Sequence, residues 1–278
     1  MNQQSPQHQT VTIKPVEGWE KIDFRELYQY RDLFFFLVWR DIKVLYAQTI
    51  LGFSWAILNP FIQIILFSVI FGKVAKLDTD GIPYVLFSTV AIVPWTYMSA
   101  SMTASSQSLV SSQGILGKIY FPRLLYPITP VLAKLVDFCL AILLVIAVLL
   151  IYDVELTSNI YFLPIFILLM ITIPAGIGLW FSSLAIRYRD VKFAMPFFIS
   201  LMIYSAPIIY SASAIPDAYR LVYSLNPIVS VIEGFRSSLL GLPFEWAFII
   251  PGAIINFLIL ASGAMYFRKM ERIVVDVI

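Results

Sequence analysis

The sequence contains few of the residues from which enzymatic and metal sites are built. Among its 278 residues there is one cysteine, Cys139, and one histidine, His8. A single cysteine excludes an intrachain disulfide. Zinc sites of clustered histidine and cysteine, and nucleophile pairs such as serine with histidine, need more of these residues than the chain holds. We therefore expect no catalytic residue and no metal site in this protein.

Charge is also scarce. Only 13% of the residues are charged and 60% are apolar, whereas a soluble domain has about 25% charged and about 45–50% apolar residues. This balance excludes a soluble enzyme, a disordered chain and a nucleic-acid-binding protein. The apolar residues form continuous runs rather than the alternating pattern of a membrane barrel. The sequence therefore predicts an all-α integral membrane protein.

Six apolar runs are long enough to cross a bilayer. A hydrocarbon core about 30 Å thick requires roughly 20 apolar residues in helical form. We expect six transmembrane helices, at residues 52–72, 82–103, 127–152, 161–186, 193–211 and 247–267. They form a domain of residues 49–278, which is preceded by an amphipathic segment and by a polar tail of residues 1–23. An even number of spans places both termini on one side of the membrane.

The basic residues indicate which side that is. Of the 19 Lys and Arg residues, 14 lie in the N-terminal segment, the second and fourth connections and the C-terminal tail, and 4 lie in the opposite connections. Because basic residues concentrate in cytoplasmic loops, the distribution predicts cytoplasmic termini. The first 20 residues lack the apolar core of a cleavable signal peptide.

Residues 24–48 have the period of an amphipathic helix. Arg25, Arg40 and Lys43 share one face, and Phe34 and Leu37 fall largely opposite. A basic and aromatic helix that leads directly into a span is expected to lie in the membrane interface. A soluble packing helix is the alternative.

Residues 212–246 are too many for a tight turn and too polar to cross the membrane. The Asn226-Pro227 pair marks a helix start near the middle of this segment. We expect a re-entrant or surface helix pair on the outer side, where Asn226, Pro227, Glu233 and Arg236 are candidates for an outer gate. Such backbone is tolerated at membrane depth only where protein or water satisfies it.

Two charges interrupt the third run. Lys134 and Asp137 are three residues apart and share a helix face. A charge within a span costs at least about 2.5 kcal/mol unless it is paired or reaches the interface. A structural ion pair and a role in transport or coupling both account for them.

Nucleotide chemistry has weak support in this chain. Asp78-Thr79-Asp80 resembles the acid pair that holds a metal-bound sugar nucleotide in glycosyltransferases, but Gly81 follows in a short outer loop, which favours a turn. The Gly-x-x-x-x-Gly-Lys-Ser/Thr phosphate loop does not occur, so the chain cannot bind ATP by that motif.

Four stretches together resemble a known family. They are residues 40–60 (RDIKVLYAQTILGFSWAILNP), 118–127 (KIYFPRLLYP), 187–191 (RYRDV) and 205–236. In order and spacing they resemble the membrane-spanning subunit, or permease, of ABC-2 type polysaccharide exporters, over about Leu33 to Phe267. Similar exporters often have basic residues on both sides of the position of Tyr46, where this chain has Leu45 and Ala47.

The resemblance implies an assembly and a place for it. A homodimer of six-span subunits would lie in the bacterial inner membrane, bound on the cytoplasmic side by two separate ATP-binding cassette subunits. ATP and Mg²⁺ would be bound by those partners, so no cofactor is expected in this chain. The connection that carries Lys118, Tyr120, Pro122 and Arg123 would contact the ATPase, and the segment after the fifth span would gate the outer end.

The implied substrate is a lipid-linked polysaccharide, O-antigen first, with teichoic acid or capsule polymer as family alternatives. We expect Arg40 and Lys43 to attract its diphosphate headgroup at the cytoplasmic surface. Sugar rings stack on aromatic planes, so residues in or beside the first and fifth spans are candidates to line the path, with contact to lipid or a neighbouring helix as the alternative. These candidates are Trp55, Phe61, Phe67, Tyr204 and Tyr210. Export of a small lipid or drug, and a membrane glycosyltransferase, are the competing functions.

Overall fold

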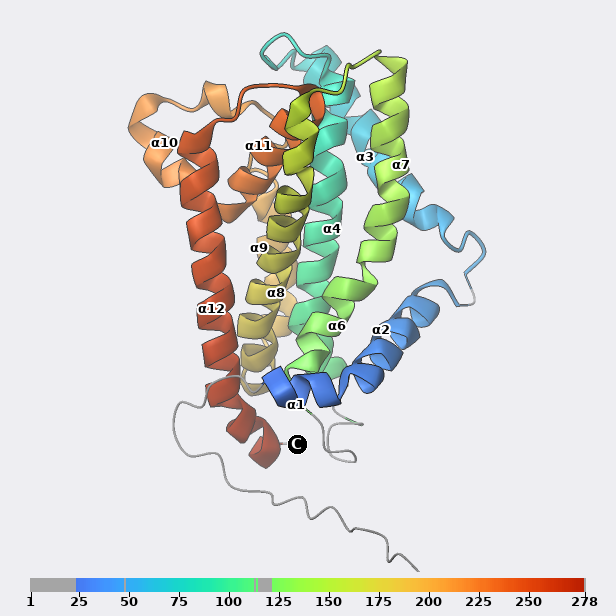
Figure 1. Cartoon of the computed structure of the whole chain (residues 1–278), viewed down its shortest axis with the longest axis vertical. Helices are drawn as coiled ribbons and strands as arrows, with labels where there is room; N and C mark the ends of the chain where they lie inside the picture. The colour runs from blue at the N-terminus through green and yellow to red at the C-terminus, as the bar shows by residue number, and fades with distance from the viewer. Residues whose placement is uncertain (1–23, 48, 113, 115–121, 278) are drawn as a thin grey trace, which may run out of the picture.

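The structure is a computed structural model (Figure 1) that describes residues 24–47, 49–112, 114 and 122–277. Only the backbone is described for residues 24, 26, 27 and 271–277. The described residues form helices and connections without a strand, which confirms the all-α prediction. In chain order the helices are α1 (Phe24–Gln29), α2 (Arg31–Tyr46), α3 (Ser54–Phe67), η1 (Ser68–Val74), α4 (Tyr84–Ser111), α6 (Leu125–Ala133), α7 (Leu135–Ile151), η2 (Ser158–Phe162), α8 (Leu163–Arg187), α9 (Val191–Met202), η3 (Ala212–Ala214), α10 (Asp217–Ser224), α11 (Pro227–Leu240) and α12 (Trp246–Val277).

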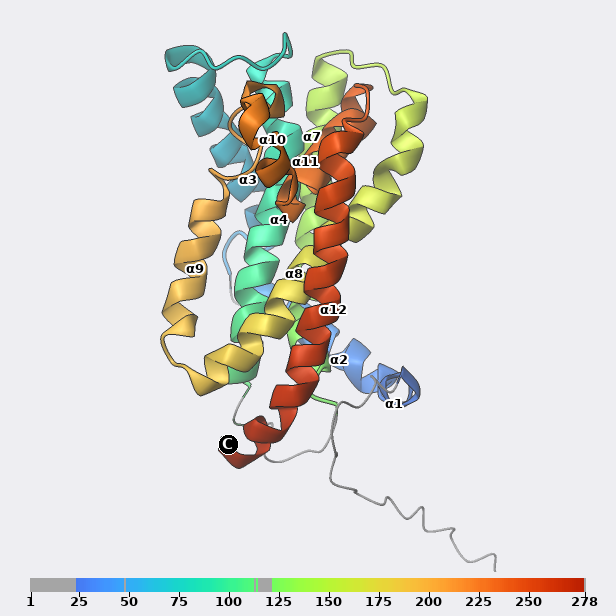
Figure 2. The same ribbon diagram turned by 90° about the vertical axis from the view of Figure 1, so that its left-hand side faces the viewer.

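The long helices stand side by side in an elongated bundle with two ends (Figure 1). At one end lie α1, α2, the start of α6 and the last turns of α12 (Figure 1). At the other end lie the connections from α3 to α4 and from α7 to α8, together with α10 and α11 (Figure 2). The junction of α8 and α9, which carries Arg187, Arg189 and Lys192, lies at the same end as α1 and the last turns of α12 (Figure 2).

Five helical stretches in the described part of the chain are long and apolar enough to cross a membrane. They are Ser54–Val74, Tyr84–Ser111, Leu125–Ile151, Ser158–Arg187 and Trp246–Met270. They correspond to the first, second, third, fourth and sixth predicted runs.

The fifth predicted run differs from a full span. Its helix α9 covers only 12 residues, Val191–Met202, which is about 18 Å of rise against a hydrocarbon core of about 30 Å. Beyond it the chain continues in turns, in which the N–H groups of Tyr204 and Ser205 bond the carbonyls of Leu201 and Met202 at 3.1 Å each. Pro207 has no N–H with which to continue a helix. The apolar run 193–211 is therefore a short helix followed by a non-helical segment.

The third span is bent where its charges begin. The helix is divided at Lys134 into α6 and α7 (Figure 1). Pro130 lies inside α6, and a proline removes a backbone hydrogen bond and crowds the carbonyl four residues earlier, which is a common cause of a kink. The bend brings Lys134 and Asp137 to the junction between the two segments.

Helix α4 is the centre of the bundle. It is buried over most of its length, and Val90, Ala91, Ile92 and Met98 are fully buried, as expected for a helix surrounded by others. Several of its hydroxyl groups bond to backbone carbonyls of the same helix: Thr89 Oγ1, for example, donates to the Val85 carbonyl at 2.6 Å. Ser105 Oγ donates to the carbonyl of Pro127 at 2.5 Å and so joins α4 to α6.

Helices α8 and α12 approach closely through two glycines. A Cβ atom on Gly176 would lie 2.9 Å from Leu260 Cα, and one on Gly263 would lie 2.6 Å from the Gly176 carbonyl oxygen. Nearby, the rings of Trp180 and Tyr266 stack with centroids 4.2 Å apart. Small residues allow such backbone contact between helices in lipid, where the hydrophobic effect does not hold helices together.

The N-terminal helices lie across the lower end of the bundle in Figure 1. Leu37 of α2 is buried in a cluster with Leu125 and Tyr126 of α6, whereas Phe36 and Trp39 are exposed. One face of α2 is thus anchored to the third span, and its exposed aromatic side chains are suited to the membrane interface.

Candidate functional site

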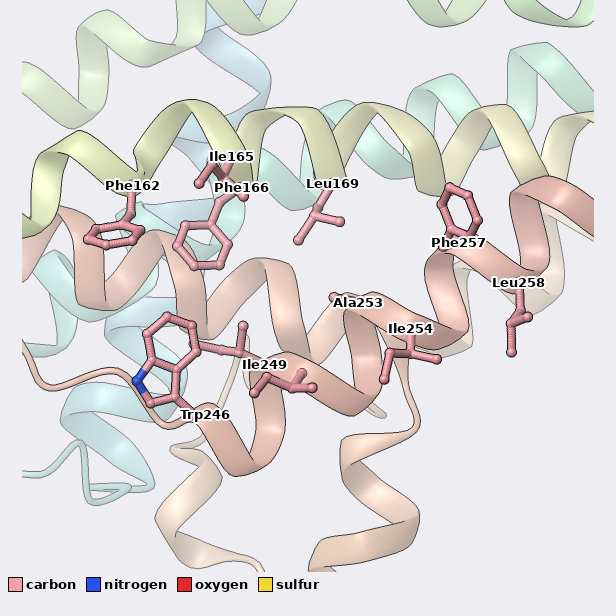
Figure 3. A pocket seen from close by; sticks show the side chains of 11 residues that line it. Phe162, Ile165, Phe166, Leu169, Trp246, Ile249, Ala253, Ile254, Phe257 and Leu258 are labelled. Carbon is pink, nitrogen blue, oxygen red and sulfur yellow. The ribbon is translucent and has the colours of Figure 1, made fainter.

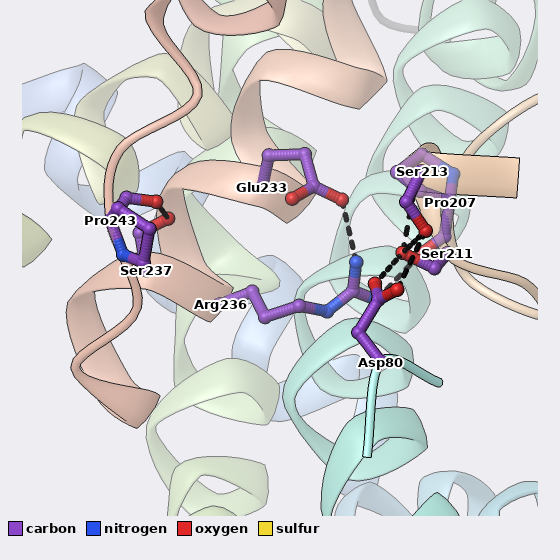
Figure 4. Close-up of polar contacts among 8 residues, drawn as sticks. All are labelled: Asp80, Pro207, Ser211, Ser213, Glu233, Arg236, Ser237 and Pro243. Carbon is purple, nitrogen blue, oxygen red and sulfur yellow. Dashed lines mark hydrogen bonds and ion pairs between the residues drawn. The ribbon is translucent and has the colours of Figure 1, made fainter. Parts of the chain in front are cut away.

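The end of the molecule that holds α10 and α11 contains a buried ion pair on α11. Arg236 and Glu233 are only 3% and 7% exposed, and Arg236 Nη1 lies 2.6 Å from Glu233 Oε1 (Figure 4). Arg236 Nη2 also donates to the Pro207 carbonyl at 2.7 Å, and its guanidinium carbon lies 3.8 Å from the centroid of the Phe87 ring. Burial raises the pKa of the Glu233 carboxyl, and the Arg236 charge opposes that shift. Arg236 therefore joins α11 to α4 and to the turns that follow α9.

The position of α11 follows from its sequence. Asn226 caps the helix, since its Oδ1 accepts the Ile228 N–H at 3.0 Å, and Pro227 is the first helical residue. The helix ends at Gly241, which adopts a φ of +69° that favours glycine. Every residue from Ile228 to Leu239 is buried, so α11 is enclosed by protein.

A second polar contact joins the α3–α4 connection to the segment after α9. Asp80 accepts hydrogen bonds from the hydroxyls of Ser211 and Ser213, the latter at 2.8 Å (Figure 4). The backbone N–H of Asp80 donates to Asp78 Oδ1 at 3.0 Å, which is the side-chain bond of an Asx turn. Asp80 thus holds a loop, and the Asp78/Asp80 pattern lies in a turn.

Asn226 makes a similar contact with the turns after α9. Its Nδ2 donates to the Ser205 carbonyl at 2.9 Å. All four predicted gate residues, Asn226, Pro227, Glu233 and Arg236, therefore lie on or immediately before α11, and two of them bind the turns after α9. Their role as a gate stays a prediction.

The charged pair of the third span has a third member that sequence reasoning missed. Lys134 Nζ lies 2.8 Å from Asp137 Oδ2, and the hydroxyl of Tyr46 donates to Asp137 Oδ1. Tyr46 is the last residue of α2, 91 positions from its partner. The only indication of this role in the sequence is that Tyr46 belongs to the RDIKVLY stretch, one of those that resemble the family. The pair is therefore tied to α2.

A cavity of about 160 Å³ with both polar and apolar lining lies beside this pair, between α2, α3, α4 and α7. Tyr46, Trp55, Asn59, Thr96, Lys134 and Asp137 are among its lining residues. Trp55, predicted to line a sugar path, belongs to this cavity.

The other predicted path residues are divided between two places. Phe61 is exposed on α3, and Phe67 is partly buried and packs edge-on against Phe71 with centroids 5.3 Å apart. Tyr204 and Tyr210 lie together after α9, where the Tyr210 hydroxyl donates to the Tyr204 carbonyl at 2.9 Å. Their lining of a path stays a prediction.

The predicted headgroup residues lie in the second half of α2. Arg40 forms an ion pair with the adjacent Asp41 at 2.8 Å, and Lys43 Nζ lies 5.4 Å from the centroid of the Trp39 ring. Of the predicted ATPase-contact residues, Lys118 and Tyr120 lie outside the described residues. Pro122 is buried and Arg123 is partly exposed at the start of the third span.

A larger apolar groove of about 500 Å³ runs between α8 and α12 (Figure 3). Phe162, Phe166 and Trp246 lie at one end of it, and Phe257 and Leu258 lie at the other. Its chemistry matches hydrocarbon, since every lining side chain is apolar apart from the indole N–H.

The sequence is similar to known proteins over most of its length. A sequence profile described as ABC-2 type transporter matches residues 32–240. The chain is 27% identical over 241 residues to an O-antigen export system permease protein of Klebsiella pneumoniae, covering 86% of this chain and 92% of that protein. It is 27% identical over 215 residues to a protein of the same name from Myxococcus xanthus, covering 77% and 82%. It is 24% identical over 224 residues to the polysialic acid transport protein of Escherichia coli, covering 79% and 83%.

Proposed function

The chain belongs to the ABC-2 type transporter family, and from this membership we propose that it is the membrane-spanning subunit of an ATP-driven exporter of lipid-linked polysaccharide. The observation that carries the proposal is the similarity to O-antigen export permeases over 86% of the chain. O-antigen is the first candidate substrate. A capsule-type polymer is the second, because a polysialic acid transport protein is also similar.

We assign ATP hydrolysis to a separate subunit. Two copies of this chain form a homodimer in the bacterial inner membrane, with cytoplasmic termini, and two ATP-binding cassette subunits bind the connection that includes Pro122 and Arg123. The clustering of basic residues at one end supports this orientation. ATP and Mg²⁺ belong to the partner, and this chain holds no cofactor.

The transport path follows from the cost of moving the substrate. Each unpaired hydroxyl in an apolar medium costs about 2–7 kcal/mol, so the sugars travel between the two subunits along polar and aromatic side chains while the lipid tail stays in the bilayer. Arg40 and Lys43 receive the diphosphate. ATP-driven motion reaches the spans through the connection before α6, and α11 with its Glu233–Arg236 pair opens the outer end.

The assembly can be tested by purification. When the full chain is isolated from its native membrane, we expect a soluble ATP-binding subunit to co-purify with it. In vesicles, we expect lipid-linked saccharide to be translocated only when that subunit and ATP are both present. Translocation by the partner-free chain, or formation of a glycosidic bond by it, would overturn the proposal.

Charge reversal tests the headgroup step. Arg40→Glu and Lys43→Glu are each expected to lower surface polysaccharide by about tenfold or more, because a hydrogen bond to a charged group contributes roughly 1.5–3 kcal/mol. Surface polysaccharide is measured by antibody binding to intact cells at equal permease level in the membrane. Arg31→Glu is the matched control, since Arg31 begins the same helix and is exposed. Equal export by all three variants would remove Arg40 and Lys43 from this step.

A further inference from the structure

The cavity beside the bend of the third span is lined by aromatic and by polar side chains. Trp55 and Tyr46 supply aromatic faces, and Asn59 and Thr96 supply an amide and a hydroxyl, next to the Lys134–Asp137 pair. Its volume of about 160 Å³ is on the order of five water volumes of about 30 Å³ each, the size scale of a single sugar ring.

The charge of the cavity decides between possible ligands. Lys134 and Asp137 neutralise one another at 2.8 Å, so the lining has no surplus positive charge with which to hold a phosphate. A hydrocarbon chain would offer no hydrogen bond to the Asn59 amide, to the Lys134 N–H groups that Asp137 does not use, or to the remaining lone pairs of Asp137. A neutral polyol satisfies both kinds of group, since its hydroxyls donate to Asp137 and accept from Lys134.

The aromatic side chains add a face for the ring. Trp55 is half-exposed on α3, and Tyr46 lies against the ring of Phe53, with centroids 3.9 Å apart. The C–H face of a sugar ring packs against such planes, while its hydroxyls reach the polar groups at the edge.

We propose that this cavity binds one neutral sugar ring of the lipid-linked substrate, the ring next to the diphosphate. The proposal rests on the proposed function. The spacing along α2 indicates which sugar of the substrate is bound. Tyr46 lies six residues beyond Arg40, or about 9 Å along the helix. A diphosphate held at Arg40 and Lys43 therefore places the adjoining sugar beside Tyr46. The Tyr46–Asp137 bond links that sugar site to the bend of the third span.

Binding to the purified permease–ATPase complex in lipid nanodiscs tests this assignment. The two probes are a lipid diphosphate that carries one N-acetylhexosamine and the same lipid diphosphate without sugar. We expect the complex to bind the sugar-bearing probe about tenfold more tightly, which corresponds to a few hydrogen bonds and one stacked ring. In Trp55→Ala and Asn59→Leu this preference is lost, while affinity for the bare lipid diphosphate is unchanged.

Ile62→Ala is the matched control, because Ile62 is 49% exposed on the same helix, is not among the cavity-lining residues, and should keep the preference. Equal binding of the two probes by the unmodified complex overturns the sugar site and leaves the proposed function standing. The sugar site is also overturned if Trp55→Ala and Asn59→Leu both keep the preference for the sugar-bearing probe. Failure of both probes to bind at all contradicts the proposed function together with this inference.

Discussion

Arg236→Ala is expected to destabilise the protein by about 3–5 kcal/mol, because it leaves the Glu233 carboxylate buried without its partner. Solvent does not reach the position of the guanidinium from the surface, since Arg236 is only 3% exposed. The substitution also removes the bond to the Pro207 carbonyl, which joins α11 to the turns after α9. We expect the outer segment to loosen and surface polysaccharide to be lost. Denaturation of the purified protein in detergent measures the first effect.

Two variants separate the ion pair from a general sensitivity of this segment. Arg220 on α10 also pairs with an acid three residues away, Asp217, but the side chains are 49% and 90% exposed, so Arg220→Ala should cost at most about 1 kcal/mol. The double variant Glu233→Leu with Arg236→Met removes both charges and should be more stable than Arg236→Ala alone. A single Arg236→Ala variant as stable as Arg220→Ala would show that the pair does not hold the segment.

Structural features that depend only on residues close together in the chain can be predicted from the sequence. Apolar run length predicts the five long spans, and Asn226-Pro227 predicts the start of α11 at Pro227. These are local effects of hydrophobicity, missing N–H groups and helix capping. The stretches that resemble ABC-2 exporters indicate the family that the profile match to residues 32–240 shows.

Features made by tertiary contact have no such local signal. The run 193–211 has the composition of a span, but its second half is turned so that the Pro207 carbonyl meets Arg236. Asp80 reaches Ser213 across 133 positions, and Tyr46 reaches Asp137 across 91. Polarity alone shows that such groups need partners, and only the packing of the helices determines which partners they find.

Gly263→Val is expected to disrupt the α8–α12 contact, with a loss of about 1–3 kcal/mol or more in unfolding free energy. A Cβ atom at Gly263 would lie 2.6 Å from the carbonyl oxygen of Gly176. That oxygen belongs to a helix backbone and cannot move aside as a side-chain end could, so the helices must separate. Separation would also pull the Trp180 ring from Tyr266 and weaken its 3.2 Å bond to Ser262.

Met265→Val shows what a valine on an exposed face of α12 costs when no neighbouring helix is close to it. Met265 lies two residues further along α12 and is 52% exposed, so the same β-branched residue there meets no neighbouring backbone and should cost under about 1 kcal/mol. Thermal unfolding of the two variants in the same detergent gives the comparison. Because α12 packs along α8 and also against α11, separation of α8 from α12 should loosen α11 as well, and Gly263→Val should lower export together with stability. Equal stability of the two valine variants would mean that α8 and α12 do not depend on their glycine contact.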